Sequence, residues 1–113
     1  MAAEGNYDDR RQHYRLIYPG EFAPGIIING RLFIVQDICE RAIRFRRDAS
    51  RHYESGQRIS ATLLFNDGTK FEVNGWVGRV YSNDVVVMLT KHIPYQKILA
   101  EQVNLQKAKK AVS

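Results

Sequence analysis

Short runs of strand-forming residues, separated by turn signals, are the feature that most constrains how this chain can fold. From Tyr14 onward, runs such as "IIINGRLFIVQDI" and "RISATLLF" are rich in the β-branched and aromatic residues that favour pleated strands. The pairs Asn29-Gly30 and Asp67-Gly68 are suited to the tight turns of β-hairpins. Because no helical pattern separates these runs, this part of the chain predicts an antiparallel β-barrel or β-sandwich.

The C-terminal segment has the periodicity of a helix. In "YQKILAEQVNLQKAKKA", apolar residues recur every three or four positions, and the lysines at the end suit the negative end of a helix. One helical face would carry Tyr95, Ile98, Leu99, Gln102 and Leu105. We therefore expect a helix over residues 94–111 that packs on the β domain or caps one end of it.

Length and composition indicate one folded domain preceded by an arm. The 113 residues suffice for one core, and 44% of them are hydrophobic. Residues 1–13 are small, polar and charged without a period, so we expect a flexible basic N-terminal arm followed by one domain over residues 14–113. No run approaches the ~20 apolar residues of a membrane span, and the first residues lack the apolar run of a signal peptide. We therefore expect a cytoplasmic protein that does not insert into a membrane.

The charge of the chain favours an anionic partner. Its formal net charge is +5 at pH 7, which suits nucleic acid, a nucleotide, an acidic protein surface or anionic lipid. The sequence has no Gly-rich phosphate loop, nucleophile elbow or His-Glu metal motif, and Cys39 and the three histidines lack metal-ligand spacing. We therefore expect a binding protein that is not an enzyme and that uses neither a cofactor nor a metal.

Three arginines, Arg10, Arg11 and Arg15, stand just before the first predicted strand in "RRQHYR". A guanidinium group is permanently charged and offers a planar fork of donors, which suits phosphate oxygens and the O6/N7 edge of guanine. Taken alone, the cluster is most simply explained as ordinary solvating charge near a chain end. Further along, "QDICERA" places Asp37 at the end of a predicted strand.

These two segments resemble the motifs of the PilZ domain family. The first motif of the family is R-R-x-x-x-R or R-x-x-x-R, which "RRQHYR" matches. Its second motif is (D/N)-x-S-x-x-G; here Asp37 matches, whereas Cys39 and Ala42 replace the serine and the glycine. "VNGWVGRV" resembles a later strand of the family with the pattern G-x-V-x-R, at Gly75 and Arg79. The resemblance covers most of the chain and includes a degenerate second motif.

The resemblance implies a mainly β fold, a six- to seven-stranded antiparallel Greek-key β-barrel with a C-terminal α-helix. It also implies a bacterial receptor for the second messenger cyclic di-GMP, in which the arm arginines contact phosphates and guanine edges. Ligand binding would order the arm and change a surface presented to a protein effector, as in the control of motility or biofilm formation. The implied ligand-binding residues are Arg10, Arg11, Arg15, Asp37, Cys39, Arg41 and Ala42. Additional candidates are Arg44, Arg46, Gly75 and Arg79.

Two departures from the second motif keep other functions open. The Cys39 thiol is a weaker hydrogen-bonding group than a serine hydroxyl, and Ala42 fits only where the backbone φ is negative. One alternative is a PilZ domain that no longer binds the nucleotide and acts as a protein adaptor. The other is a general nucleic-acid-binding β-barrel, which is less favoured because the strand aromatics alternate like core residues. These aromatics are Phe33, Phe45, Phe65, Phe71 and Trp76.

Overall fold

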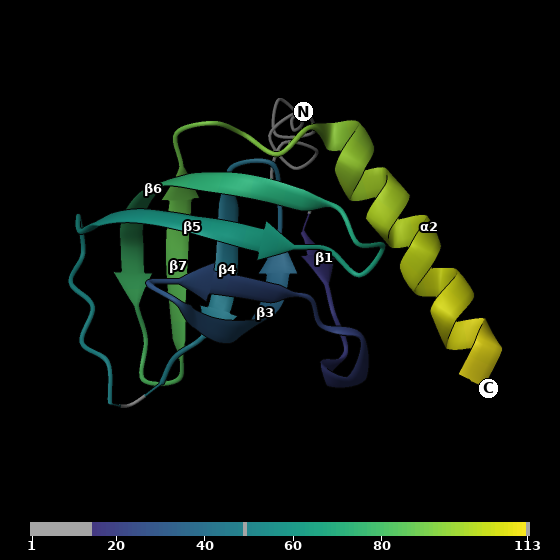
Figure 1. Cartoon of the computed structure of the whole chain (residues 1–113), viewed down its shortest axis with the longest axis horizontal. Coiled ribbons are helices and arrows are strands. Elements are labelled where there is room, and N and C mark those ends of the chain that lie inside the picture. Colours follow the sequence, from purple (N-terminus) through teal and green to yellow (C-terminus); the bar gives the residue numbers. More distant parts are fainter. Residues whose placement is uncertain (1–14, 49, 113) are drawn as a thin grey trace, which may run out of the picture.

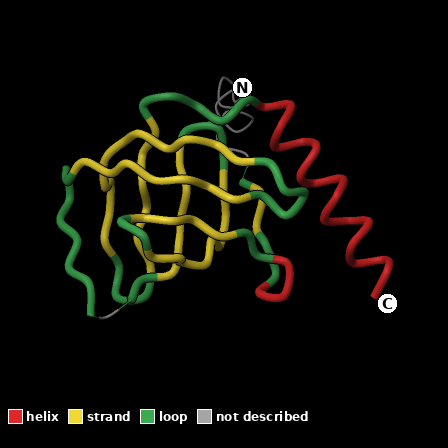
Figure 2. The backbone as a smooth tube through the Cα atoms, viewed as in Figure 1, coloured by secondary structure: helices red, strands yellow, loops and turns green. Residues whose placement is uncertain are grey.

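The computed structural model describes residues 15–48 and 50–112, which form seven strands, one 3-10 helix and one α-helix (Figure 1, Figure 2). In chain order these elements are β1 (Leu16–Ile17), η1 (Gly20–Phe22), β2 (Gly25–Ile28), β3 (Arg31–Ile38), β4 (Ala42–Arg46), β5 (Arg58–Leu64), β6 (Lys70–Val80), β7 (Asp84–Leu89) and α2 (Tyr95–Val112). The predicted N-terminal arm lies outside the described residues. Within the described residues, no helix is long and apolar enough to cross a membrane.

Six of the strands close into an antiparallel barrel, which confirms the predicted mainly β fold. Along the sheet the order is β1-β3-β2-β5-β6-β7-β4, and the additional pairing of β3 with β4 closes the barrel. The remaining strand, β1, is not part of the closed barrel. It pairs with the end of β3, with Leu16 opposite Ile38 and Ile17 opposite Asp37. The first two strands of the chain therefore both lie against β3.

The predicted hairpin turns have the backbone conformation that their sequence requires. Between β2 and β3, Asn29 has φ 51° and Gly30 has φ 79°, the left-handed values of a two-residue hairpin turn. Between β5 and β6, Gly68 has φ 89° and donates its N–H to the carbonyl oxygen of Phe65 at 3.1 Å. These turns determine which residues of the paired strands face the interior.

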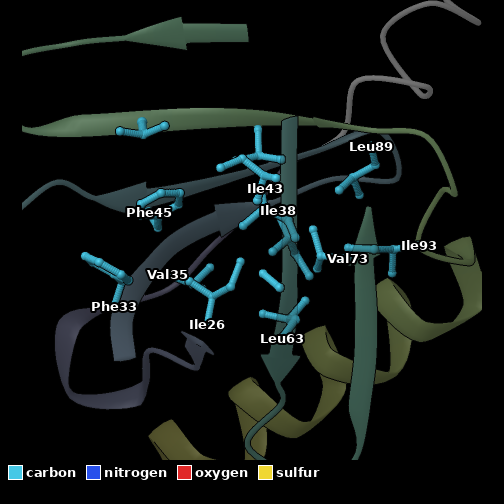
Figure 3. Packing of buried hydrophobic residues seen from close by; sticks show 14 of the residues in the cluster. Ile26, Phe33, Val35, Ile38, Ile43, Phe45, Leu63, Val73, Leu89 and Ile93 are labelled. Carbon is cyan, nitrogen blue, oxygen red and sulfur yellow. The ribbon is translucent and has the colours of Figure 1, made fainter. Parts of the chain in front are cut away.

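Aliphatic and aromatic side chains fill the barrel interior (Figure 3). On β4, Ile43 and Phe45 are fully buried while Arg44 and Arg46 face outward, which is the predicted alternation. The expectation that Trp76 belongs to the core is wrong. Its side chain is 38% exposed because the neighbouring positions on β6 are the ones that face inward. Because side chains fill the interior, the surface available for binding is the outer face of the barrel.

Helix α2 packs on the barrel through a face that differs from the predicted one. Ile98 and Leu105 are buried as expected, but Leu99 is 39% exposed, contrary to the prediction. The third buried position is Glu101, which is only 2% exposed. The helical face that meets the barrel therefore includes a carboxylate.

Four polar contacts hold this carboxylate and the helix in place. The Tyr18 hydroxyl donates to Oε1 of Glu101 at 2.8 Å, and Nζ of Lys97 lies 3.9 Å from Oε2. Nζ of Lys97 also donates to Asp67 Oδ2 and to Thr69 Oγ1, each at 2.7 Å, and so ties α2 to the turn between β5 and β6. Burial raises the pKa of Glu101, whereas the hydrogen bond from Lys97 lowers the pKa of Asp67.

Replacing Glu101 with glutamine should change how stability depends on pH. Because the pKa of Glu101 is raised above its usual 4.5, the folded wild type holds this proton more tightly than the unfolded chain. As the pH rises from 4.5 through the raised pKa, the wild type should therefore lose stability relative to Glu101→Gln. Urea unfolding of both proteins between pH 4.5 and 8 measures the difference. Tyr18, Lys97 and Asp67 stay unchanged in both proteins, so a constant difference would contradict the burial argument.

Gly75 should tolerate no side chain, because a Cβ atom there would overlap the backbone carbonyl oxygen of Met88 on β7. We expect Gly75→Ala to lower the free energy of unfolding by about 1–3 kcal/mol, the usual cost of overpacking. Gly20→Ala is the matched control, since a Cβ there meets no atom within 4 Å. Urea denaturation of the two variants measures the difference; equal stability would show that β6 and β7 can separate at no cost.

Candidate ligand-binding groove

A groove of about 410 Å³ lies on the outer surface of the barrel where β1, β3 and β4 meet. The groove is lined by Ile17, Tyr18, Gly20, Ala23, Ile34, Val35, Gln36, Arg44, Arg46 and Asp84. Strands β1, β3 and β4, the segment after β1, and the first residue of β7 therefore form its walls. Its volume is in the range of small-molecule sites.

The guanidinium of Arg44 is held between two carboxylates. Its Nε donates to Oδ2 of Asp37 at 2.8 Å, and its Nη2 lies 2.6 Å from the same oxygen. Its Nη1 lies 3.5 Å from Oδ2 of Asp84. Asp37 is 4% exposed, so Arg44 supplies the counter-charge that a buried carboxylate needs. The arrangement fixes the direction of the Arg44 side chain while leaving some of its N–H donors for a ligand.

Two exposed arginines lie in, or directly next to, the segments of the chain that line the groove. The two carboxylates offset the charge of Arg44, whereas Arg46 is exposed at the edge of the groove. Arg15 is exposed directly before β1. These two cations, rather than Arg44, are therefore the ones most available to an anion.

A second, smaller hollow continues the groove along β3 and β4. It measures about 290 Å³ and shares Ile34 and Arg46 with the groove. Within it Arg31 pairs with Asp48 at 3.1 Å. Exposed aliphatic side chains alternate with these charges, including Leu32, which is 65% exposed. The combined surface can contact both an anionic group and the face of an apolar ring.

The structure describes only part of the predicted arginine motif. Arg10 and Arg11 lie outside the described residues, whereas Arg15 stands two positions before Ile17 of the groove. Of the second motif, Asp37 is close to the groove but faces Arg44. The predicted contact of Asp37 with a guanine base therefore stays a prediction.

The remaining residues of the second motif lie in the turn between β3 and β4 and at the first position of β4. Cys39 is 7% exposed, and its backbone N–H donates to the carbonyl oxygen of Ala42 at 2.9 Å. Arg41 is exposed at the tip of this turn. Among the described residues other than glycine, only Asn29 has a positive φ, so Ala42 avoids the strain of a left-handed conformation. The loss of the motif glycine therefore costs no backbone strain here.

Two additional candidates lie away from the groove. Gly75 on β6 faces the backbone of β7, where the chain allows no side chain. Arg79 is exposed on β6 opposite Val86, and neither residue lines the groove. Both therefore stay predictions without support from the groove geometry.

Several groove residues were not among the sequence predictions. Asp84 stands more than forty positions after Asp37, and the register of β4 against β7, which places Arg46 opposite Asp84, brings it to Arg44. Ile17 and Ile34 are 63% and 50% exposed, although their sequence context is that of core strands. In a strand, inward and outward positions alternate. An aliphatic residue at an outward position is the sequence signal that could have indicated Ile17 and Ile34 as surface residues. Within the described residues, no cluster of His, Cys, Asp or Glu could hold a metal ion.

Comparison with known proteins shows similarity of structure alone. No family model and no curated protein sequence matches the chain. The crystal structure of an uncharacterized Legionella protein matches with a TM-score of 0.61 and 16% identity, over 86% of this chain and 98% of the other. The structure of YcgR from Escherichia coli in complex with cyclic di-GMP matches with a TM-score of 0.58 and 14% identity.

What these proteins share is the fold. The match to YcgR covers 87% of this chain but only 49% of YcgR, so the chain spans about half the length of that protein. This match supports a PilZ-like fold.

Arg44 should contribute to stability in a way that Arg46 does not. Arg44→Met would leave the buried Asp37 without its cation, and we expect a loss of about 2–3 kcal/mol in the free energy of unfolding. Arg46→Met, on the same strand face, should change stability by less than about 0.5 kcal/mol. Urea denaturation of the two variants tests this. Equal stabilities would mean that solvent, rather than Arg44, compensates the charge of Asp37.

Proposed function

We propose that this chain is a receptor that binds cyclic di-GMP in the groove formed by β1, β3 and β4. The observation that carries the proposal is the groove itself, where exposed Arg46 and the fixed guanidinium of Arg44 stand beside exposed Ile17 and Ile34. A cyclic dinucleotide combines two phosphates with two flat bases, and this surface has groups suited to each. The fold similarity to YcgR, which was solved with cyclic di-GMP, supports the same ligand.

The charge distribution suggests how the arginines divide their roles. Arg46 and Arg15 face solvent, so we assign phosphate contacts to them. Arg44 is already neutralised by Asp37 and Asp84, and its spare N–H donors suit the O6/N7 edge of guanine. In this scheme Asp37 positions Arg44. That role differs from the direct guanine contact that the motif implies.

The arm arginines can take part because of their position in the chain. Arg11 stands four positions before Arg15, and an extended chain covers up to ~3.4 Å per residue. A ligand beside Ile17 is therefore within reach of Arg11, and Arg10 could add a further phosphate contact. We propose that ligand binding orders the arm and thereby changes the surface offered to an effector protein.

The proposal describes a receptor with no catalytic step. Neither similar structure is named as an enzyme. A second candidate is a protein adaptor that does not bind the nucleotide. It is favoured by one observation: the side chains at two positions of the second motif are not free to contact a ligand. Asp37 is engaged by Arg44, and Cys39 is buried. A binding measurement separates the two candidates.

Isothermal titration calorimetry with cyclic di-GMP tests the proposed function. We expect Arg46→Ala and Arg15→Ala each to weaken binding about tenfold or more, since each removes a charge-assisted contact. Arg11→Ala should do the same if the arm reaches the ligand. Arg58→Ala removes an exposed arginine on β5 outside the groove and should leave the affinity unchanged. Cyclic di-AMP, which lacks the guanine edge, should bind more weakly.

Two results would contradict the proposal. An absence of heat with cyclic di-GMP at near-millimolar concentration would favour the adaptor function. Binding that is weakened equally by Arg46→Ala and by Arg58→Ala would indicate attraction to the overall charge rather than a site in the groove.

A further inference from the structure

Tyr18 connects the groove with helix α2. The residue lines the groove directly after β1, yet its side chain is 6% exposed and its hydroxyl donates to Oε1 of Glu101 on α2. The two residues are 83 positions apart in the sequence. A single side chain therefore spans from the candidate ligand site to the C-terminal helix.

The backbone of Tyr18 belongs to the groove. Its N–H donates at 2.9 Å to the carbonyl oxygen of Gln36, which also lines the groove and precedes Asp37 on β3. The two residues of β1 before it pair only with the end of β3 in the described structure. Because β1 is so short, a change in its position or order must carry Tyr18 with it.

On the side of the helix, Glu101 depends on the Tyr18 hydroxyl. Its side chain is 1% exposed, and Oε2 is buried with no hydrogen-bond partner among the described residues. Among the residues that the structure describes, the hydroxyl of Tyr18 thus supplies the one short hydrogen bond to this carboxylate, and the more distant Lys97 compensates its charge. Losing that bond leaves a buried polar group poorly satisfied, which loosens the contact between α2 and the barrel.

We infer that the hydrogen bond between Tyr18 and Glu101 couples occupancy of the groove to the docking of α2. This inference rests on the proposed function for the ligand, but the coupling itself is a property of the ligand-free fold. A ligand that orders β1 strengthens the hold of Tyr18 on Glu101 and so tightens α2. By linkage, loosening α2 at Glu101 weakens ligand binding by the same factor.

Hydrogen exchange of the ligand-free protein, followed by NMR, tests the coupling. Glu101→Met removes the acceptor on α2, and we expect the residue 18 amide to exchange about two- to tenfold faster. Tyr18→Phe removes only the hydroxyl and should speed exchange of the α2 amides by a similar factor. Val103→Ala is the matched control, because it changes an exposed residue of α2 away from the Tyr18 bond. It should leave exchange of the residue 18 amide unchanged.

The outcomes of this experiment are distinct. If Glu101→Met leaves the residue 18 amide unchanged, or if Val103→Ala affects it equally, the coupling through Tyr18 is wrong. These results decide the inference whether or not cyclic di-GMP binds.

The same measurement with cyclic di-GMP tests the link to the ligand. We expect the ligand to slow exchange in α2 of the wild type, and to have no such effect in Glu101→Met, whose substituted residue lies outside the groove. Binding by the wild type with no change in α2 would overturn the inference and leave the proposed function standing. An absence of binding would refute the proposed function, and the ligand-free exchange data would still decide the coupling.

Discussion

Closure of the barrel through β3 is the constraint on which the rest of this structure depends. One half of β3 pairs with β2 and the other half with β4, with a shift of register between Val35 and Asp37. Closure turns one face of every barrel strand into an interior, which is filled by side chains such as Ile26 and Phe45. A small ligand is therefore left with the outer surface, and the register shift lies beside the groove found there.

Two buried carboxylates, those of Asp37 and Glu101, lie next to the two-residue strand β1 and the residue that follows it. Asp37 pairs with Ile17 along the backbone and with Arg44 through its side chain, and Glu101 accepts the hydroxyl of Tyr18. A buried carboxylate is costly unless it is paired and hydrogen-bonded, so each one restrains the groups around it. This requirement, rather than apolar packing alone, gives β1 a defined position between the groove and α2.

Local patterns predicted the secondary structure well and the burial of single residues less well. The Asn29-Gly30 turn and the alternation of β4 follow from the preferences of neighbouring residues, and both are present as predicted. Trp76 and Leu99 are exposed although they were predicted to be buried, and the burial of Glu101 was not predicted. An aromatic strand residue normally packs inside and a helical glutamate normally faces solvent, and only packing against other elements reverses either preference.

The sequence by itself determined the strands, the tight turns, the C-terminal helix and the excess of arginine, because these depend on neighbouring residues and on composition. It also contained the motif that resembles a nucleotide-binding family. Only the tertiary structure decided that Arg44 holds Asp37 and meets Asp84, and that Tyr18 reaches Glu101. These pairs are set by strand register and helix docking, where the need to compensate buried charge selects partners that lie far apart in the chain.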